Sequence, residues 1–171
     1  MVGAVLEFTL NDDAVMQGLA RLQEGVTDAQ PLMQAIGSYG VRSTQQRFRD
    51  ETAPDGTRWK ELNPAYAELK GSDNILTRSG ALMQSMNARP GMNEVRWGAT
   101  MEYAAVHQFG ATIKAKNAPS LAFMLGGRGL APVQLVRVQS VTIPARPYLG
   151  INADDREEIV ALTGEYIRSL I

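Results

Sequence analysis

The spacing of apolar residues changes along the chain, and these changes predict helices in some segments and strands in others. Residues 6–10 alternate between apolar and polar positions, as in a strand with one buried face. A helix is expected next, capped by one of residues 11–13 and running to about Glu24. Pro31 suits the first turn of a second helix, which should end near Glu51.

The middle of the chain is rich in turn-forming residues. Pro54-Asp55-Gly56 predicts a tight turn, because proline presets one backbone angle and glycine accepts a positive one. Trp59 follows and should anchor this loop. Two short helices are expected, one from Asn63-Pro64 and one over Leu76 to Met86.

The pattern then changes from helix to strand. A hairpin turn over residues 90–93 leads into a strand over residues 95–98. A brief helix over Tyr103 to Gln108 should end at Gly110, whose missing side chain permits a left-handed backbone. Residues 113–143 predict a long hairpin with Gly126 to Gly129 at its tip.

Asn152 or Asp154 can cap a last helix, which carries apolar residues on one side up to Leu170. The elements together predict an α+β fold in which an antiparallel sheet with a long hairpin packs against N-terminal and C-terminal helices. At 171 residues, with no linker or repeat, we expect residues 1–171 to form a single domain.

Composition removes several classes of function. A formal net charge of -1 gives no general positive field, so sequence-specific nucleic acid binding is not expected. The absence of cysteine removes disulfides and thiolate chemistry, as is common for proteins made in the cytosol. No signal peptide or membrane-spanning stretch is recognisable, so we expect a soluble chain without a membrane partner.

His107, the only histidine, could act as a base near neutral pH. However, Ser38, Ser79 and Ser120 lack the Gly-x-Ser-x-Gly setting of a nucleophile. A structural or capping role for His107 is therefore favoured over a catalytic one. A lone histidine without cysteine also predicts no metal site, and no cofactor is expected.

Other patterns with possible chemistry have simpler interpretations. The paired carboxylates at residues 12–13, 154–155 and 157–158 could serve a glycosidase, but helix starts favour acids, so capping is preferred. Gly126 to Gly129 lacks the Lys-Ser/Thr of a phosphate loop and is better explained as a hairpin tip. The aromatic residues are interpreted as core and interface anchors rather than base-stacking groups: Trp59, Trp97, Tyr103 and Phe109.

An ordered set of short motifs resembles the phage virion morphogenesis and tail-completion family, from Phe48 to the last helix. The motifs are Phe48 with Glu51, Pro54-Asp55-Gly56 with Trp59, Leu62-Asn63-Pro64 with Tyr66 and Lys70, Ile75-Leu76-Thr77 with Ser79-Gly80 and Leu82, Val95 to Gly98, Tyr103-Ala104, His107-Gln108-Phe109-Gly110 and Arg146-Pro147-Tyr148-Leu149-Gly150. The stretch from Pro119 to Thr142 is longer and more apolar than in a minimal member.

This resemblance implies a structural protein without enzymatic activity, located in the virion at the neck or tail end and made in the bacterial host cytoplasm. Such a protein completes the tail and joins it to the head of a tailed phage or prophage. We expect a homo-oligomeric ring, six-fold as the family suggests, that contacts other neck and tail proteins. Closed rings use heterologous contacts, and the hairpin over residues 113–143 is expected at one of them.

Two other functions remain open at this stage. One is a phage-associated cell-wall hydrolase that uses His107 with a carboxylate such as Glu102. The other is a ring or scaffold component that touches phage DNA during its passage, through contacts that weaken steeply with salt.

Overall fold

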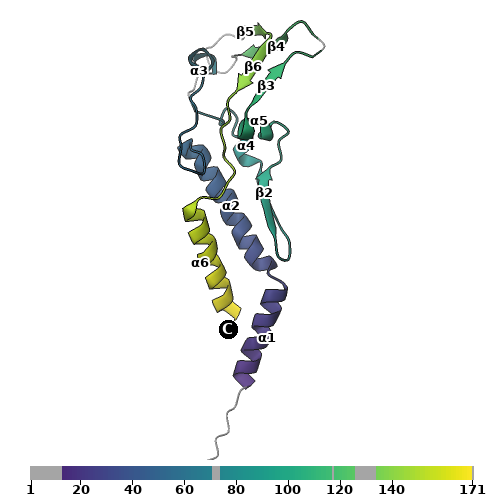
Figure 1. Ribbon diagram of the computed structural model, residues 1–171, viewed down its shortest axis with the longest axis vertical. Coiled ribbons are helices and arrows are strands. Elements are labelled where there is room, and N and C mark those ends of the chain that lie inside the picture. The colour runs from purple at the N-terminus through teal and green to yellow at the C-terminus, as the bar shows by residue number, and fades with distance from the viewer. Residues whose placement is uncertain (1–12, 71–73, 117, 126–133, 171) are drawn as a thin grey trace, which may run out of the picture.

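The computed structural model describes residues 13–70, 74–116, 118–125 and 134–170. The strand expected over residues 6–10 and the hairpin tip at Gly126 to Gly129 lie outside the described residues. Figure 1 shows an elongated molecule, with a stem of helices at one end and the longer hairpin at the opposite end. The α+β class predicted from the sequence is confirmed.

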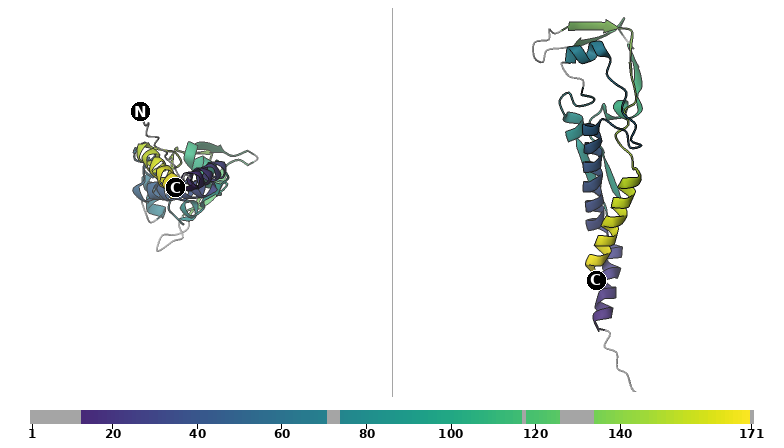
Figure 2. Two further views of the ribbon diagram at one scale, coloured as in Figure 1. Left: turned by 90° about the horizontal axis from the view of Figure 1, so that it is seen from below. Right: turned by 90° about the vertical axis from the view of Figure 1, so that its left-hand side faces the viewer.

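The stem consists of α1 (Asp13–Thr27), α2 (Gln30–Asp50) and α6 (Ala153–Leu170). The predicted start and end of α2 are confirmed, because Pro31 lies in its first turn and Glu51 follows it with a left-handed φ of 55°. The helix α6 lies beside α2, and α1 extends beyond the C-terminal end of α6 (Figures 1 and 2). The Tyr166 hydroxyl donates to the Gly25 carbonyl at 3.3 Å and so joins α6 to α1. None of the described helices is long and apolar enough to cross a membrane.

A short hairpin of β1 (Met86–Pro90) and β2 (Val95–Ala99) packs against α2. Glycine at position 40 permits this packing, since a Cβ there would lie 2.7 Å from the Trp97 ring. The predicted turn and second strand are thereby confirmed, but β1 was not predicted.

The helix predicted over Leu76 to Met86 is wrong for most of its length. Only α4 (Ala81–Gln84) is helical, and Leu76 has a φ of 58°, which a right-handed helix cannot contain. The local cause is the burial of Ile75, whose backbone N–H donates to the Glu51 carboxylate. Met86 is buried, but it belongs to a strand rather than to a helix. The prediction failed because a few apolar residues at mixed spacing do not distinguish the two structures.

The remaining helices are α3 (Pro64–Lys70) and α5 (Ala104–Phe109), both predicted. Gly110 ends α5 with a positive φ of 74°, but its ψ of 162° is extended rather than left-handed helical.

The long hairpin consists of two successive antiparallel ladders. In one ladder β3 (Ala111–Lys114) pairs with β6 (Ser140–Ile143), and in the other β4 (Leu121–Leu125) pairs with β5 (Gln134–Val138). The strands are antiparallel, as predicted, and the described strands form three separate two-stranded sheets. The two ladders are separated by unequal numbers of residues, since residues 115–120, with Pro119 among them, lie between β3 and β4, whereas only Gln139 lies between β5 and β6.

The hydrophobic core lies where the end of α2 meets the loops below the long hairpin. Trp59 is 4% exposed, which confirms that it anchors its loop. The buried core residues are Phe48, Trp59, Ile75, Leu82, Met86, Ala104 and Tyr148.

Candidate functional site

The segment Arg146 to Gly150 brings several distant motifs together in the core. The Trp59 indole donates to the Pro147 carbonyl at 2.7 Å, and the Tyr148 hydroxyl donates to the Ala104 carbonyl at 3.0 Å. The Phe48 ring packs against both aromatic side chains, with centroid distances of 5.4 Å to Trp59 and 5.1 Å to Tyr148. Burial raises the pKa of the Tyr148 hydroxyl, so it remains a donor at neutral pH.

Arg146 connects this segment to the loop after Trp59. Its guanidinium donates to the carbonyls of Lys60 at 2.7 Å and Glu61 at 3.0 Å, and its backbone N–H donates to the His107 carbonyl at 2.8 Å. The residue is only 5% exposed, and burial lowers the pKa of its guanidinium. Arg146 therefore holds two loops together.

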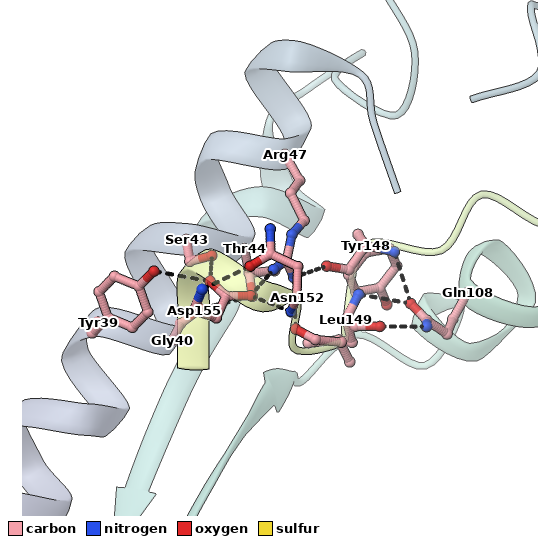
Figure 3. A network of polar contacts seen from close by, with 11 residues as sticks. Tyr39, Gly40, Ser43, Thr44, Arg47, Gln108, Tyr148, Leu149, Asn152 and Asp155 are labelled. Atoms are coloured by element: carbon pink, nitrogen blue, oxygen red, sulfur yellow. Dashed lines mark hydrogen bonds and ion pairs between the residues drawn. The ribbon is translucent and has the colours of Figure 1, made fainter. Parts of the chain in front are cut away.

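Gln108 pairs with the backbone of the same segment (Figure 3). Its Oε1 accepts from the N–H groups of Tyr148 and Leu149, both at 3.0 Å, and its Nε2 donates to the Leu149 carbonyl at 3.0 Å. A side-chain amide is suited to this position because it both donates and accepts. It thereby satisfies backbone groups that none of the described strands pairs with.

A buried ion pair between Arg47 and Asp155 fixes α6 against α2 (Figure 3). The other guanidinium nitrogen of Arg47 donates to the carbonyls of Tyr148 at 3.1 Å and Gly150 at 2.8 Å. One side chain of α2 thus holds both the motif segment and the last helix. We refer to Arg47, Asp155 and the groups bonded to them as the buried polar network.

Asp155 is the centre of this network. Its carboxylate also accepts from the Tyr39 hydroxyl at 2.9 Å, from the Ser43 hydroxyl and from the Asn152 N–H at 2.9 Å. Burial by itself would raise the pKa of this carboxyl, but these hydrogen bonds and the Arg47 charge lower it below its usual range. Burial and the neighbouring Asp155 charge raise the pKa of Tyr39 in turn.

The predicted cap of α6 is confirmed at Asn152, whose Oδ1 accepts from the Asp155 N–H at 2.7 Å. The Asn152 N–H in turn donates to the Asp155 carboxylate, so the two residues form a reciprocal cap. Asp155 therefore takes part in the cap, as predicted for the acids at this helix start, but it is also buried, at 4% exposed. The partner that buries it, Arg47, was not predicted.

The Pro54-Asp55-Gly56 turn is confirmed and packs against the motif segment. The Gly56 N–H donates to the Ala53 carbonyl at 2.9 Å, which closes the turn. Asp55 accepts from the Thr57 N–H at 2.9 Å, and this bond lowers the pKa of its carboxyl. A Cβ at position 150 would lie 2.6 Å from Pro54 Cγ, so the turn rests directly on Gly150.

His107 is placed for packing rather than for catalysis. Its ring meets Tyr103 edge-on at 5.8 Å, and its Nδ1 is buried without a hydrogen-bond partner among the described residues. Burial and then the Arg146 charge lower its pKa, so the ring is neutral at pH 7. Glu102 is exposed, and no carboxylate in the described part of the chain forms an ion pair with His107. The hydrolase hypothesis therefore gains no support.

An open, largely apolar pocket of about 950 Å³ lies beside His107, between α3, α5 and the long hairpin. Tyr66, Phe123 and Val136 are among its lining side chains.

Across the described ranges, no three acidic or histidine side chains gather to hold a metal ion. Two of the predicted core and interface anchors lie outside the core, since Phe109 is 76% exposed and Tyr103 is 44% exposed.

Comparisons with known proteins agree along the length of the chain. A family model described as the phage virion morphogenesis family matches residues 10–168. Mu-like prophage FluMu G protein 2 of Haemophilus influenzae is 27% identical over 168 residues, which cover 98% of this chain and 99% of the relative. The putative capsid assembly protein G of Escherichia phage Mu is 26% identical over 140 residues, or 78% of this chain and 76% of the relative. No solved structure matches the chain.

Proposed function

Because the chain belongs to the phage virion morphogenesis family, we propose that it is a structural protein of the phage neck, which completes the tail and joins it to the head. The match over residues 10–168 carries this proposal, since it includes the stem, the core motifs and the hairpin. In this proposal residues 1–171 act as one domain without enzymatic activity, located in the virion at the neck or tail end.

The arrangement of the site supports a mechanical role. The motif segment is held through its backbone by Arg47, Gln108 and Trp59, so the side chains around it fix one geometry. A subunit fixed in this way keeps its two ends at a constant position relative to each other. An elongated body with a rigid stem suits a joint between two larger assemblies.

We propose further that identical copies form a ring, six-fold as the family resemblance suggests, with the long hairpin at an interface. Each ladder of the described hairpin has two strands, so each strand has one open edge, and open edges readily pair with other chains. Leu135 is also 57% exposed on β5. Deleting residues 119–139 should abolish assembly measured by light scattering, and unchanged assembly would exclude the hairpin from the interface. If the ring surrounds the phage DNA, its contacts with the DNA are transient.

Deleting the gene in the phage or prophage that encodes this chain tests the neck assignment. We expect electron microscopy to show filled heads and finished tails that are not joined, and the wild-type gene supplied from a plasmid should restore joining. The description of the phage Mu relative gives a second candidate, a role in capsid assembly. Missing or malformed heads would favour that candidate and reject the neck role.

A further inference from the structure

The charges of the chain are unevenly distributed, and the long hairpin carries only positive ones. Between Glu102 and Asp154 the sequence contains no Asp or Glu, while its bases are Lys114, Lys116, Arg128, Arg137 and Arg146. Since the whole chain has a net charge of -1, the rest of the sequence sums to -6, that is -1 minus these 5 charges. The hairpin is therefore a positive region in an otherwise acidic protein.

Three exposed cations flank the point where the two ladders of the hairpin meet: Lys114, Lys116 and Arg137. Lys114 ends β3 opposite Ser140, and Arg137 lies opposite Ala122 in the other ladder, separated from Ser140 only by Val138 and Gln139. No ion pair in the described part of the chain includes any of the three. We call these three residues the basic junction.

The helix α6 presents an acidic stripe that matches this junction. Asp154, Glu158 and Glu165 are all exposed, and their spacings of four and seven residues place them on one face of the helix, which also carries the exposed Arg168 at its C-terminal end. The stripe is about 16 Å long at 1.5 Å per residue. In one copy α6 lies in the stem and the long hairpin lies at the other end, so the two surfaces do not meet (Figures 1 and 2).

We infer that the basic junction of one copy binds the acidic stripe on α6 of a neighbouring copy. The inference rests on the proposed assembly of identical copies and names its contact surfaces. Two unlike patches that complement each other give a heterologous contact, the type that closes into a ring. Leu135, which is 57% exposed and lies two residues before Arg137 on the same face of β5, adds apolar area to the contact.

A second copy fits the basic junction better than DNA does. DNA would also attract the cations, but the chain is negative outside the hairpin, and this charge opposes approach to a polyanion. The α6 stripe, by contrast, supplies three exposed carboxylates for the three exposed cations of the junction. Complementary charges of this kind set the partner and its orientation.

Charge reversal in both surfaces tests the contact. One variant carries Lys114→Glu with Arg137→Glu, and the other carries Glu158→Lys with Glu165→Lys. Each alone should weaken association at least about 100-fold, since two attractive pairs become repulsive. A mixture of the two variants should assemble again, because alternating copies place reversed junctions on reversed stripes and unchanged junctions on unchanged stripes. Reversal of two exposed cations elsewhere, Arg58→Glu with Arg89→Glu, is the matched control and should leave assembly intact.

Assembly is measured as the mass of the purified full-length chain by native mass spectrometry, or in particles if the chain assembles only there, with circular dichroism to show that each variant folds. Normal assembly of either reversed variant overturns the inference, and so does failure of the mixture. Loss of binding to a random-sequence DNA duplex by the junction variant, with no rescue in the mixture, overturns it in favour of DNA. If the wild-type chain itself is monomeric in solution and in particles, the proposed ring fails, which is a different result.

Discussion

Replacing Asp155 by asparagine should be among the most damaging small changes to this fold. The substitution keeps the size of the side chain but removes the charge that faces the Arg47 guanidinium. Both side chains are almost fully buried, at 6% and 7% exposed, so the cation would remain in the interior without its counter-ion. Breaking a buried pair in this way costs about 3–5 kcal/mol. That is a large share of a typical free energy of unfolding of about 5–15 kcal/mol.

Urea unfolding followed by tryptophan fluorescence measures this cost, because Trp59 lies in the core beside Phe48. The chain provides a matched control in the exposed pair of Arg96 and Glu94, whose side chains are 80% and 66% exposed. Glu94→Gln should change the free energy of unfolding by less than about 1 kcal/mol.

A double variant separates the unpaired charge from the lost hydrogen bonds. Arg47→Met combined with Asp155→Asn should cost roughly 2 kcal/mol less than the sum of the two single variants, since it leaves no isolated charge. The reasoning would be refuted if Asp155→Asn lay within about 1 kcal/mol of the wild type, or if the two substitutions were additive.

The same carboxyl predicts sensitivity to acid. Because the folded pKa of Asp155 is lowered, its stabilising contribution is present above the unfolded value of about 3.9 and is lost as the pH falls further. The wild type should therefore lose stability below about pH 4 more steeply than Asp155→Asn, which has no proton to gain at this position.

Three further predictions address the surrounding contacts. Burial lowers the pKa of His107, so below about pH 6.5 the unfolded chain binds a proton more readily than the folded chain does; stability should fall from pH 7 to pH 5 by a fraction of the limiting slope of about 1.4 kcal/mol per pH unit, because solvent screens the half-buried ring, and His107→Leu should flatten this slope in urea titrations. Tyr148→Phe removes the hydroxyl that donates to the buried Ala104 carbonyl and should lower the free energy of unfolding in urea by about 1–2 kcal/mol; an unchanged urea midpoint would contradict a stabilising role for that bond. Gly150→Ala would force its Cβ against Pro54 and should lower thermal stability by an amount equivalent to about 1–3 kcal/mol, whereas an unchanged melting temperature would show that the turn moves freely.

The sequence predicts the long helices well because their ends carry local signals. Pro31 and Asn152 mark the starts of α2 and α6, and both predictions are confirmed. Turn chemistry likewise predicts the Pro54 turn and the β1–β2 turn. These features depend on residues within a few positions of one another, so a single sequence contains the necessary information.

Features that depend on distant partners were not predictable in this way. Arg47 and Asp155 are 108 positions apart, and nothing local shows that an arginine on α2 meets an acid in the first turn of α6. Tyr39, Ser43 and Arg47 recur at intervals of four on one face of α2, which was a usable sign of a buried polar stripe. The separation of the strands into three small sheets depends on packing against α2 and on the interruption in the hairpin, and periodicity reports neither.

Imaging the neck of purified particles by electron cryomicroscopy tests the central claim most directly. The account predicts a closed ring of identical elongated subunits between head and tail, into which the stem and hairpin of this chain fit. Density for this chain in the capsid shell, or a neck that contains none of it, would contradict the account.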